Sequence, residues 1–414
     1  MSRRLAYALL AMTAGQAAVY IARPTTSYRL LSLGYDAGDV GLVAAAYALL
    51  PLLAAIPLGR YSDRRHAGPL IGAGCGLQGA ACVLLAVADT ALTLGLASTV
   101  LGLGHLAVAL GVQDVIARES HPESHDQHFG LLTAGVSLGQ LVGPLIAGAV
   151  LGDRSGTALT GATSRAMLVA AGIAAGAAIC GFLAQRRQPA TPFVRTAETR
   201  SGSVRAILAT PGVPAGIFAS IAVLAAADVF TAYMPVLGEE RGISPGAIGV
   251  LLALRAASSL VSRLGIGKFV ALAGRLRLMT LSAIAAALAF CGVALSGDVT
   301  VLAAFSLVAG FGLGFGQPLS MTLVAQLVPQ HARATALSVR LSGNRIGQVA
   351  APAAAGLVAG AAGPAAAFWL LAAVLAASGL VLQRSSVAGP IIGESSSDRD
   401  AGLQEERVPS AYWP

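Results

Sequence analysis

Three ionisable side chains interrupt long apolar runs of this sequence, and they are the residues best placed to do chemistry there. Asp228 stands near the middle of one run, Arg23 lies directly before Pro24 in another, and Arg255 is central in a third. A charge at the centre of a membrane helix costs about 2.5–3.5 kcal/mol, so it needs a partner, a wet cavity or a ligand. A carboxylate there can exchange protons or bind a cation, whereas an arginine can hold an anion.

We expect Asp228, Arg23 and Arg255 to line one cavity. Two alternatives stay open for Arg23: it binds an anionic group or pairs with Asp228 in the cavity, or its extended side chain reaches the membrane headgroups. Arg255 lies too centrally for that and requires an acidic partner, a substrate carboxylate or water. Weaker candidates for the cavity are polar residues that could equally form hydrogen bonds between helices, namely Gln16, Tyr20, Gln113, Tyr233 and Gln317.

Two further groups of charged residues are expected near helix ends rather than in the cavity. Asp114 and Arg118 are four residues apart, a spacing that places both side chains on one face of a helix and lets them pair. Arg340 and Arg345 lie in one half of a later apolar run, with Asn344 between them. Either arginine could partner a carboxylate from the other half of the chain.

No motif for enzyme or cofactor chemistry stands out. The four cysteines lie singly within apolar runs and form no CxxC or Cys/His cluster, so neither a metal site nor a disulfide framework is indicated. We interpret His121, His125 and His128 as a solvated loop. The sequence has no Walker A motif, so ATP is not the expected energy source. We therefore expect no enzyme activity, no metal and no cofactor, with a proton gradient as the driving force.

The elements that position these residues are expected to be membrane helices. Of the 414 residues, 56% are hydrophobic and only 11% are charged, whereas soluble domains carry about 25% charged residues. A helix needs about 20 apolar residues to cross the hydrocarbon core. Twelve segments meet that length: 5–30, 38–59, 68–88, 91–116, 129–151, 166–185, 212–237, 246–267, 278–296, 299–325, 336–360 and 363–383. Because these runs are long and do not alternate, a β-barrel is excluded.

Positive charge is distributed unequally between alternate loops. Nineteen Lys and Arg residues fall on the side of the predicted membrane that holds both termini, and four fall on the other side. Because positively charged loops stay in the cytoplasm, we expect both termini to be cytoplasmic, in the plasma membrane of a bacterium. The net charge of +8 sits in these short clusters. We therefore expect membrane lipids and a small-molecule substrate as partners, and no nucleic acid.

The two halves of the sequence repeat each other at a constant offset of 208 residues. The string GQLVGP at 139–144 aligns with GQVAAP at 347–352, and several glycines from 34 to 148 align with glycines from 242 to 356 without a gap. Two such halves, related by an axis along the membrane normal, enclose a central cavity. The sequence therefore predicts an all-α membrane protein with twelve transmembrane helices in two pseudo-symmetric six-helix halves.

The repeat also divides the chain into domains. We expect an N-terminal six-helix bundle at 1–185, a cytoplasmic linker at 186–211, a C-terminal six-helix bundle at 212–383 and a disordered cytoplasmic tail at 384–414. Rocking of the two bundles would expose the cavity to each side in turn, and we expect the chain to work as a monomer.

The segment after the second predicted span resembles a motif of the major facilitator superfamily, Gly-x-x-x-Asp-Arg-x-Gly-Arg-Arg. Gly59, Asp63 and Arg64 match this pattern, although its last three positions depart from it, and the resemblance covers residues 5–383. The resemblance implies the fold of that family and a cytoplasmic gate between the halves. Its expected residues are Gly59, Asp63, Arg64, Asp114, Arg118, Arg340 and Arg345.

The fifth predicted span is similar to a glycine motif of exporters in the same family. The matching residues are Gly130, Gly139, Gly143, Pro144 and Gly148, with Ala147 in place of one glycine. Small residues at this spacing also let helices pack closely, which is the plainer interpretation. A further pattern of proton-coupled exporters, an arginine in the fourth span, is replaced by Ser98.

Together these features predict a secondary transporter that moves a small organic solute by alternating access, and they favour proton-coupled efflux. Symport uptake of a small anionic metabolite is the alternative, because buried arginines favour carboxylates and phosphates. A non-transporting membrane sensor is another alternative, which only the polar tail suggests.

Overall fold

The structure is a computed structural model that describes residues 2–64, 68–119, 125–184 and 203–387. Helices make up nearly all of this part, and no strand occurs in it. The six long helices of the first half are α1 Arg3–Ser32, α2 Ala37–Arg64, α3 Gly68–Val87, α4 Ala91–Glu119, α5 His125–Leu151 and α6 Gly156–Ala184. Those of the second half are α8 Val213–Glu240, α9 Pro245–Leu264, α11 Arg275–Leu295, α12 Val299–Leu327, α13 Arg333–Ala362 and α14 Ala365–Val387.

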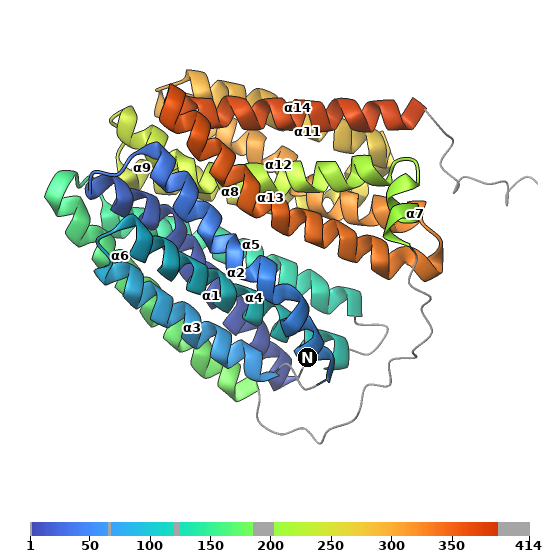
Figure 1. Ribbon diagram of the computed structural model, residues 1–414, viewed down its shortest axis with the longest axis horizontal. Coiled ribbons are helices and arrows are strands. Elements are labelled where there is room, and N and C mark those ends of the chain that lie inside the picture. Colours follow the sequence, from blue (N-terminus) through green and yellow to red (C-terminus); the bar gives the residue numbers. More distant parts are fainter. Residues whose placement is uncertain (1, 65–67, 120–124, 185–202, 388–414) are drawn as a thin grey trace, which may run out of the picture.

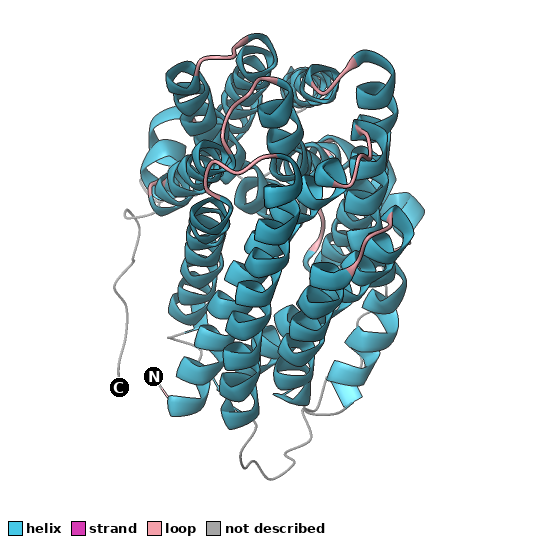
Figure 2. Ribbon diagram, turned by 90° about the vertical axis from the view of Figure 1, so that its left-hand side faces the viewer, coloured by secondary structure: helices cyan, strands magenta, loops and turns pink. Residues whose placement is uncertain are grey.

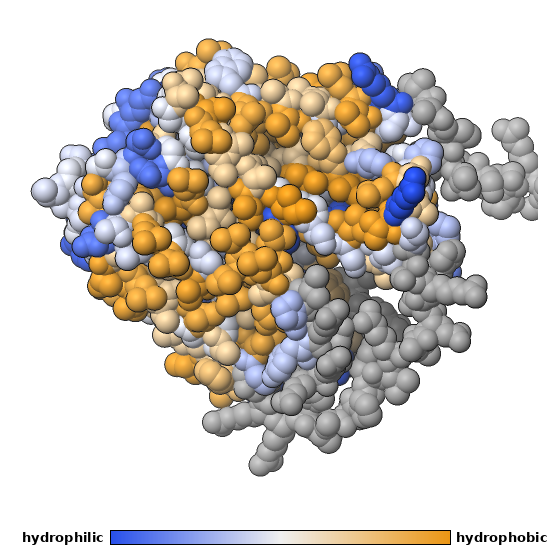
Figure 3. Space-filling model, in the orientation of Figure 1, coloured by the Kyte–Doolittle hydropathy of each residue, from blue (hydrophilic) through white to orange (hydrophobic). Residues whose placement is uncertain are grey.

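The twelve long helices confirm the predicted architecture. Eleven helices of the described part are long and apolar enough to cross a membrane. The twelfth, α13, has 30 residues and the necessary length, but Arg340, Arg345 and Gln348 make it more polar than the others. In Figure 3 the polar side chains gather at the two ends of the molecule, and apolar side chains cover the surface between them. A membrane protein needs such an apolar belt.

Some boundaries differ from the predicted ones. Helix α6 starts ten residues earlier than expected, at Gly156, and α14 continues to Val387. The expected linker ends in a short helix, α7 Val204–Ala209, and a second short helix, α10 Ile266–Ala273, precedes α11. The rest of the expected linker, 185–202, and the tail from 388 onward lie outside the described residues.

The two halves lie side by side as separate bundles (Figure 1). Helix α1 packs on α4, α5 and α6 in the first bundle, and its repeat counterpart α8 packs on α12, α13 and α14 in the second. These two helices also contact each other, so they form the centre of the molecule. Short connections join the helices at the end that faces the viewer in Figure 2, whereas α1 begins and α14 ends at the opposite end of the molecule (Figure 1). We call these the tight end and the terminal end.

Glycines bring the halves into backbone contact at the tight end. A methyl group added at Gly41 of α2 would lie 2.5 Å from the Cα of Gly356 in α13. On the opposite side, one added at Gly249 of α9 would lie 2.6 Å from the carbonyl oxygen of Pro144 in α5. The offset of 208 relates Gly41 to Gly249 and Pro144 to Pro352, so the repeat produces two equivalent contacts. We call this pair of contacts the glycine seam.

Two arginines hold the short connections at the tight end. Arg29 of α1 donates to the carbonyl oxygens of Ala88 and Thr160, at 3.1 and 2.9 Å, and to the hydroxyl of Ser164 at 3.0 Å. In the second half, Arg241 donates to backbone carbonyls of the last turn of α11 and of Ser296, which follows it. Because each guanidinium binds several helix-end carbonyls, it fixes those ends relative to one another.

Candidate transport site

An ion pair joins the two halves where α1 meets α8. Arg23 Nη1 lies 2.6 Å from Asp228 Oδ1, and the two side chains are only 10% and 7% exposed. Gln348 of α13 donates its Nε2–H to the other carboxylate oxygen, Oδ2, at 2.9 Å. Both oxygens of Asp228 therefore have partners, one from each half. The pairing of Arg23 with Asp228 belongs to the first of the two alternatives that the sequence left open.

The ion pair continues into a chain of polar contacts on both sides. The guanidinium of Arg23 lies 4.8 Å from the centre of the Tyr47 ring, a distance at which the ring's negative face attracts a cation. The Tyr47 hydroxyl in turn forms a short hydrogen bond with Nδ1 of His105 in α4. On the other side, Arg345 donates to Gln348 at 3.0 Å. Five helices thus contribute to one buried network.

A cavity opens beside the carboxylate. It holds about 400 Å³ of empty space, part of it open to solvent. Its lining residues come from α1, α5, α8, α9 and α12; they are Tyr20, Gln140, Val223, Leu224, Ala227, Asp228, Arg255, Ser259, Arg263, Leu313 and Gln317. We call this the Asp228 cavity. All three of its charged residues belong to the second half.

A second hollow of about 350 Å³ lies on the arginine side of the ion pair, nearer the tight end. It is enclosed by α1, α2 and α4 with Ala232 of α8; Arg23, Tyr47 and Ser98 are among its lining residues. The ion pair therefore stands between two cavities: Asp228 lines one and Arg23 lines the other.

Arg255 and Arg263 are the two cations of the Asp228 cavity. Arg255 is 4% exposed, and its guanidinium lies 5.7 Å from the centre of the Phe230 ring. Arg263 donates to the hydroxyl of Ser137 in α5 at 3.2 Å. The Nε atom of each arginine is buried and has no hydrogen-bond partner in the described part of the chain. Neither arginine forms an ion pair with a carboxylate there.

The structure brings some predicted cavity residues together and separates others. Tyr20, Asp228, Arg255 and Gln317 line the Asp228 cavity, and Arg23 adjoins it. Three others lie elsewhere. Tyr233 donates to the backbone carbonyl of Ala37 at 2.9 Å beside the glycine seam. Gln16 is buried where α1 packs on α5. Gln113 is exposed on α4.

The predicted gate residues divide into two sets. Arg118 Nε lies 2.7 Å from Asp114 Oδ1, so the expected pairing within α4 is confirmed. Arg340 instead braces α13 against α12, donating to the Gln317 side chain at 2.8 Å, and Arg345 belongs to the central network. Gly59, Asp63 and Arg64 belong to the last turns of α2, which extends to Arg64, and their surroundings lie outside the described set.

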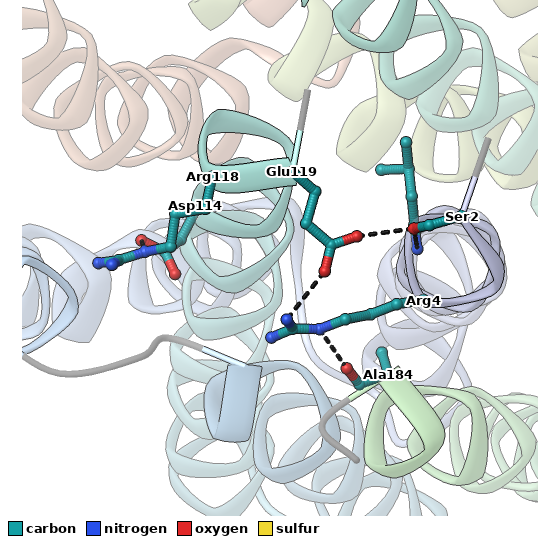
Figure 4. Close-up of polar contacts among 7 residues, drawn as sticks. Ser2, Arg4, Asp114, Arg118, Glu119 and Ala184 are labelled. Atoms are coloured by element: carbon teal, nitrogen blue, oxygen red, sulfur yellow. Dashed lines mark hydrogen bonds and ion pairs between the residues drawn. The ribbon is translucent and has the colours of Figure 1, made fainter. Parts of the chain in front are cut away.

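A separate cluster ties the terminal end of the first bundle together (Figure 4). Arg4 lies 2.8 Å from Glu119 Oε1 and donates from Nε to the carbonyl oxygen of Ala184 at 2.6 Å. Ser2 donates to Glu119 Oε2 at 2.7 Å. These contacts join α1, α4 and α6, and no residue spacing in the sequence predicts them.

The glycines of α5 serve close packing. A methyl group at Gly139 would lie 2.7 Å from the Gln16 side chain, and one at Gly143 would lie 2.8 Å from the carbonyl of Ala17, both on α1. Gly148 faces α9 in the glycine seam. Gly130 has no atom within 4 Å of such a methyl group among the described residues. Pro144 lies within the helix, where its carbonyl meets Gly249.

Several residues of the site did not stand out in the sequence: Tyr47, His105, Gln140, Arg263 and Gln348. The sequence could have indicated the two glutamines, because they occupy the same place in the repeated string at 139–144 and 347–352. Arg263 lies near the predicted end of its span, where an arginine is typical of the membrane surface. Tyr47 and His105 are neutral residues within apolar runs, and only their contact with Arg23 and with each other identifies them.

Comparisons with known proteins agree with this architecture. The model of the Major Facilitator Superfamily matches residues 7–236 and 216–390. A bacterial homologue of the human lysosomal transporter Spinster, solved in an inward-facing and unoccupied conformation, is similar with a TM-score of 0.72 at 17% identity, covering 94% of this chain and 96% of that one. The nucleoside transporter NupG is similar with a TM-score of 0.69 at 15% identity, covering 93% and 99%.

A POT family transporter in complex with a thioalcohol-conjugated peptide is similar with a TM-score of 0.72 at 14% identity, covering 93% of this chain and 96% of that one. At sequence identities this low, the likeness shows a shared fold and nothing about the solute. No curated protein matches the sequence.

Proposed function

Because this chain belongs to the major facilitator superfamily, it is a multi-pass membrane transporter and not an enzyme, and we propose that it exports a small organic solute in exchange for protons. Alternating access in this fold requires two halves that rock about a central site. The Asp228 cavity is the proposed solute site, and the proton gradient is the proposed driving force. Lipid would surround a single working chain.

The observation that carries the proposal is the Arg23–Asp228 ion pair. Uptake of one proton by Asp228 would neutralise the carboxylate and release Arg23 from the pair. Because the pair joins α1 of one half to α8 of the other, its strength differs between arrangements of the halves. A proton that binds one arrangement better than the other shifts the balance between them. That linkage is what proton-driven transport requires.

The direction of transport rests on two supports. The charge bias of the loops supports a terminal end in the cytoplasm, on the inner side of a bacterial plasma membrane. The glycine seam then closes the outer side, so this conformation is proposed to receive its solute from the cytoplasm. The glycines of α5 match the pattern of exporters, although their contacts with α1 and α9 are also sufficient for packing alone.

Proteoliposomes with an imposed pH gradient test the coupling. The solute panel should include matched acids, amides and amines, with a pH-sensitive dye inside the vesicles. We expect solute movement to be accompanied by proton movement, and Asp228→Asn to abolish the proton movement. Asp89→Asn, the same substitution at an exposed position, serves as the control. Solute transport that is indifferent both to the gradient and to Asp228→Asn would overturn the coupling.

Symport uptake of a small anion is the second candidate. The two arginines of the Asp228 cavity, Arg255 and Arg263, favour it, because each lacks a carboxylate partner in the described residues. Inward accumulation of an acid, driven by protons moving in the same direction, would establish uptake in place of efflux.

A further inference from the structure

We infer that the solute of the Asp228 cavity is an organic anion, with Arg255 as the residue that binds its charged group and an apolar body filling the rest of the cavity. This inference rests on the proposed function only in taking the cavity as the solute site. It holds for either direction of transport.

The charge balance of the cavity is the first argument. Its lining contains one carboxylate, Asp228, and two guanidiniums, Arg255 and Arg263. The charge of this carboxylate is already balanced by Arg23, which binds one of its oxygens, and Gln348 donates a hydrogen bond to the other. Arg23 itself faces the neighbouring cavity. The Asp228 cavity is therefore left with two positive charges that no acidic side chain of the described residues balances.

The surroundings of Arg255 are the second argument. The side chain is almost fully buried, its guanidinium lies over the face of the Phe230 ring, and its polar neighbours are the Tyr20 side chain and the already paired Asp228. Its Nε–H is left without an acceptor. A buried cation without a carboxylate is unfavourable, and a buried donor without a partner adds to the cost. A ligand carboxylate would offset both, because the guanidinium fork binds its two oxygens in parallel.

The position of Arg263 is the third argument. It lies eight residues after Arg255 on α9, which places it about 12 Å further toward the terminal end at 1.5 Å per residue. Two cations in line along a cleft attract anions toward the deeper one and raise their rate of entry. Arg263 is therefore assigned to the approach and Arg255 to the bound state.

The remaining walls define the rest of the solute. Val223, Leu224 and Ala227 of α8 and Leu313 of α12 form an apolar surface, against which a hydrocarbon or aromatic body is favoured. Two amides, Gln140 and Gln317, are polar but uncharged, and that of Gln317 already binds the Ser220 carbonyl and Arg340. A cationic solute would meet two like charges and have only an already neutralised carboxylate to pair with.

Binding measurements on solutes of equal shape and different charge test the inference. The full-length protein is placed in phosphatidylcholine nanodiscs, so that no anionic lipid competes for the site. Its thermal unfolding is followed with benzoate, benzamide and benzylamine, and with matched acid, amide and amine sets built on longer alkyl and aryl bodies. We expect stabilisation by acids only. No stabilisation by any acid, or equal stabilisation by the amides or amines, would overturn the inference.

Variants then identify the residue that binds the charged group of the acid. We expect Arg255→Gln to weaken acid binding at least about tenfold, and Arg255→Lys to retain part of it. Arg165→Gln, which removes an exposed arginine from α6, should change nothing. Because Arg255→Gln removes a buried, unpaired charge, the unliganded protein should keep or gain thermal stability, which separates lost binding from misfolding. Acid binding that survives in Arg255→Gln would overturn the assignment.

The outcomes for binding and for transport are distinguishable. Amines or amides that bind and cross the membrane would refute the inference that the solute is an anion, and would leave the transporter proposal intact. Acids that bind through Arg255 but never cross a proteoliposome membrane would refute the transporter proposal and leave the anion site intact.

Discussion

The ion pair between Arg23 and Asp228 offers the sharpest test of how the two halves are held together. At the 2.6 Å separation of Nη1 and Oδ1, two unit charges attract by about 6 kcal/mol at an effective dielectric constant of about 20. Desolvation of both groups removes much of that gain. Replacing only Asp228 by Asn keeps the desolvated arginine and loses its charge partner. We expect Asp228→Asn to destabilise the protein by about 3–5 kcal/mol.

A double-mutant cycle isolates the interaction. Arg23→Met alone should destabilise by a similar amount, because it leaves a buried carboxylate, whereas the double variant Arg23→Met/Asp228→Asn should recover most of the loss. Unfolding in detergent, followed by circular dichroism, gives the three free energies. Asp89→Asn, in an exposed connection, should cost less than about 0.5 kcal/mol. Additive losses in the double variant, or a neutral Asp228→Asn, would refute the reasoning.

Two further outcomes follow from the tight end. Gly249→Val should hold the halves apart, because a methyl group added at this position would lie 2.6 Å from the Pro144 carbonyl oxygen. In that variant, a second substitution, Ser244→Cys, should give a thiol that reacts faster with an impermeant maleimide than the same thiol does with Gly249 in place. An unchanged rate would contradict a closed seam. Arg29→Met should lower the free energy of unfolding by about 2–3 kcal/mol, because charge-assisted hydrogen bonds are lost and buried carbonyls are left without donors. Thermal unfolding measures this loss. An unchanged unfolding temperature would show that water replaces the guanidinium.

The sequence predicted the fold well because the signals for it are global. Apolar run length, loop charge and the repeat each extend over many residues, and together they predict twelve helices in two halves. The late predicted start of α6 shows where hydropathy alone fails. Residues 156–165 include threonines and a serine, yet the Thr163 hydroxyl is satisfied by the Thr160 carbonyl one turn earlier. Such residues are more compatible with a membrane helix than their hydropathy indicates.

The site was predicted less completely because it depends on which way each helix faces. Tyr233 follows Asp228 by five residues, which turns it about 140° around α8 at 3.6 residues per turn. It therefore points to the glycine seam and not into the cavity. Arg23 and Asp228 were easier to find, because a buried charge requires a partner wherever its helix faces. Tyr47 and His105 carry no such requirement, so only the packing of α2 and α4 against α1 reveals them.

The charged lining of the Asp228 cavity has a consequence for the orientation of its cargo. The repeat places Tyr20 opposite Asp228 and Tyr47 opposite Arg255, so what is aromatic in the first half is charged in the second. The helices of the two halves are arranged symmetrically, but the charged residues of the cavity are not. They lie on the side of the second bundle, so the cavity has a charged side and an aromatic side that face each other in the plane of the membrane. A solute with one charged group would be held with that group toward the second bundle. Rocking of the bundles about an axis in that plane would carry it across without turning it end over end, and enantiomers of one solute would present different sides to Tyr20.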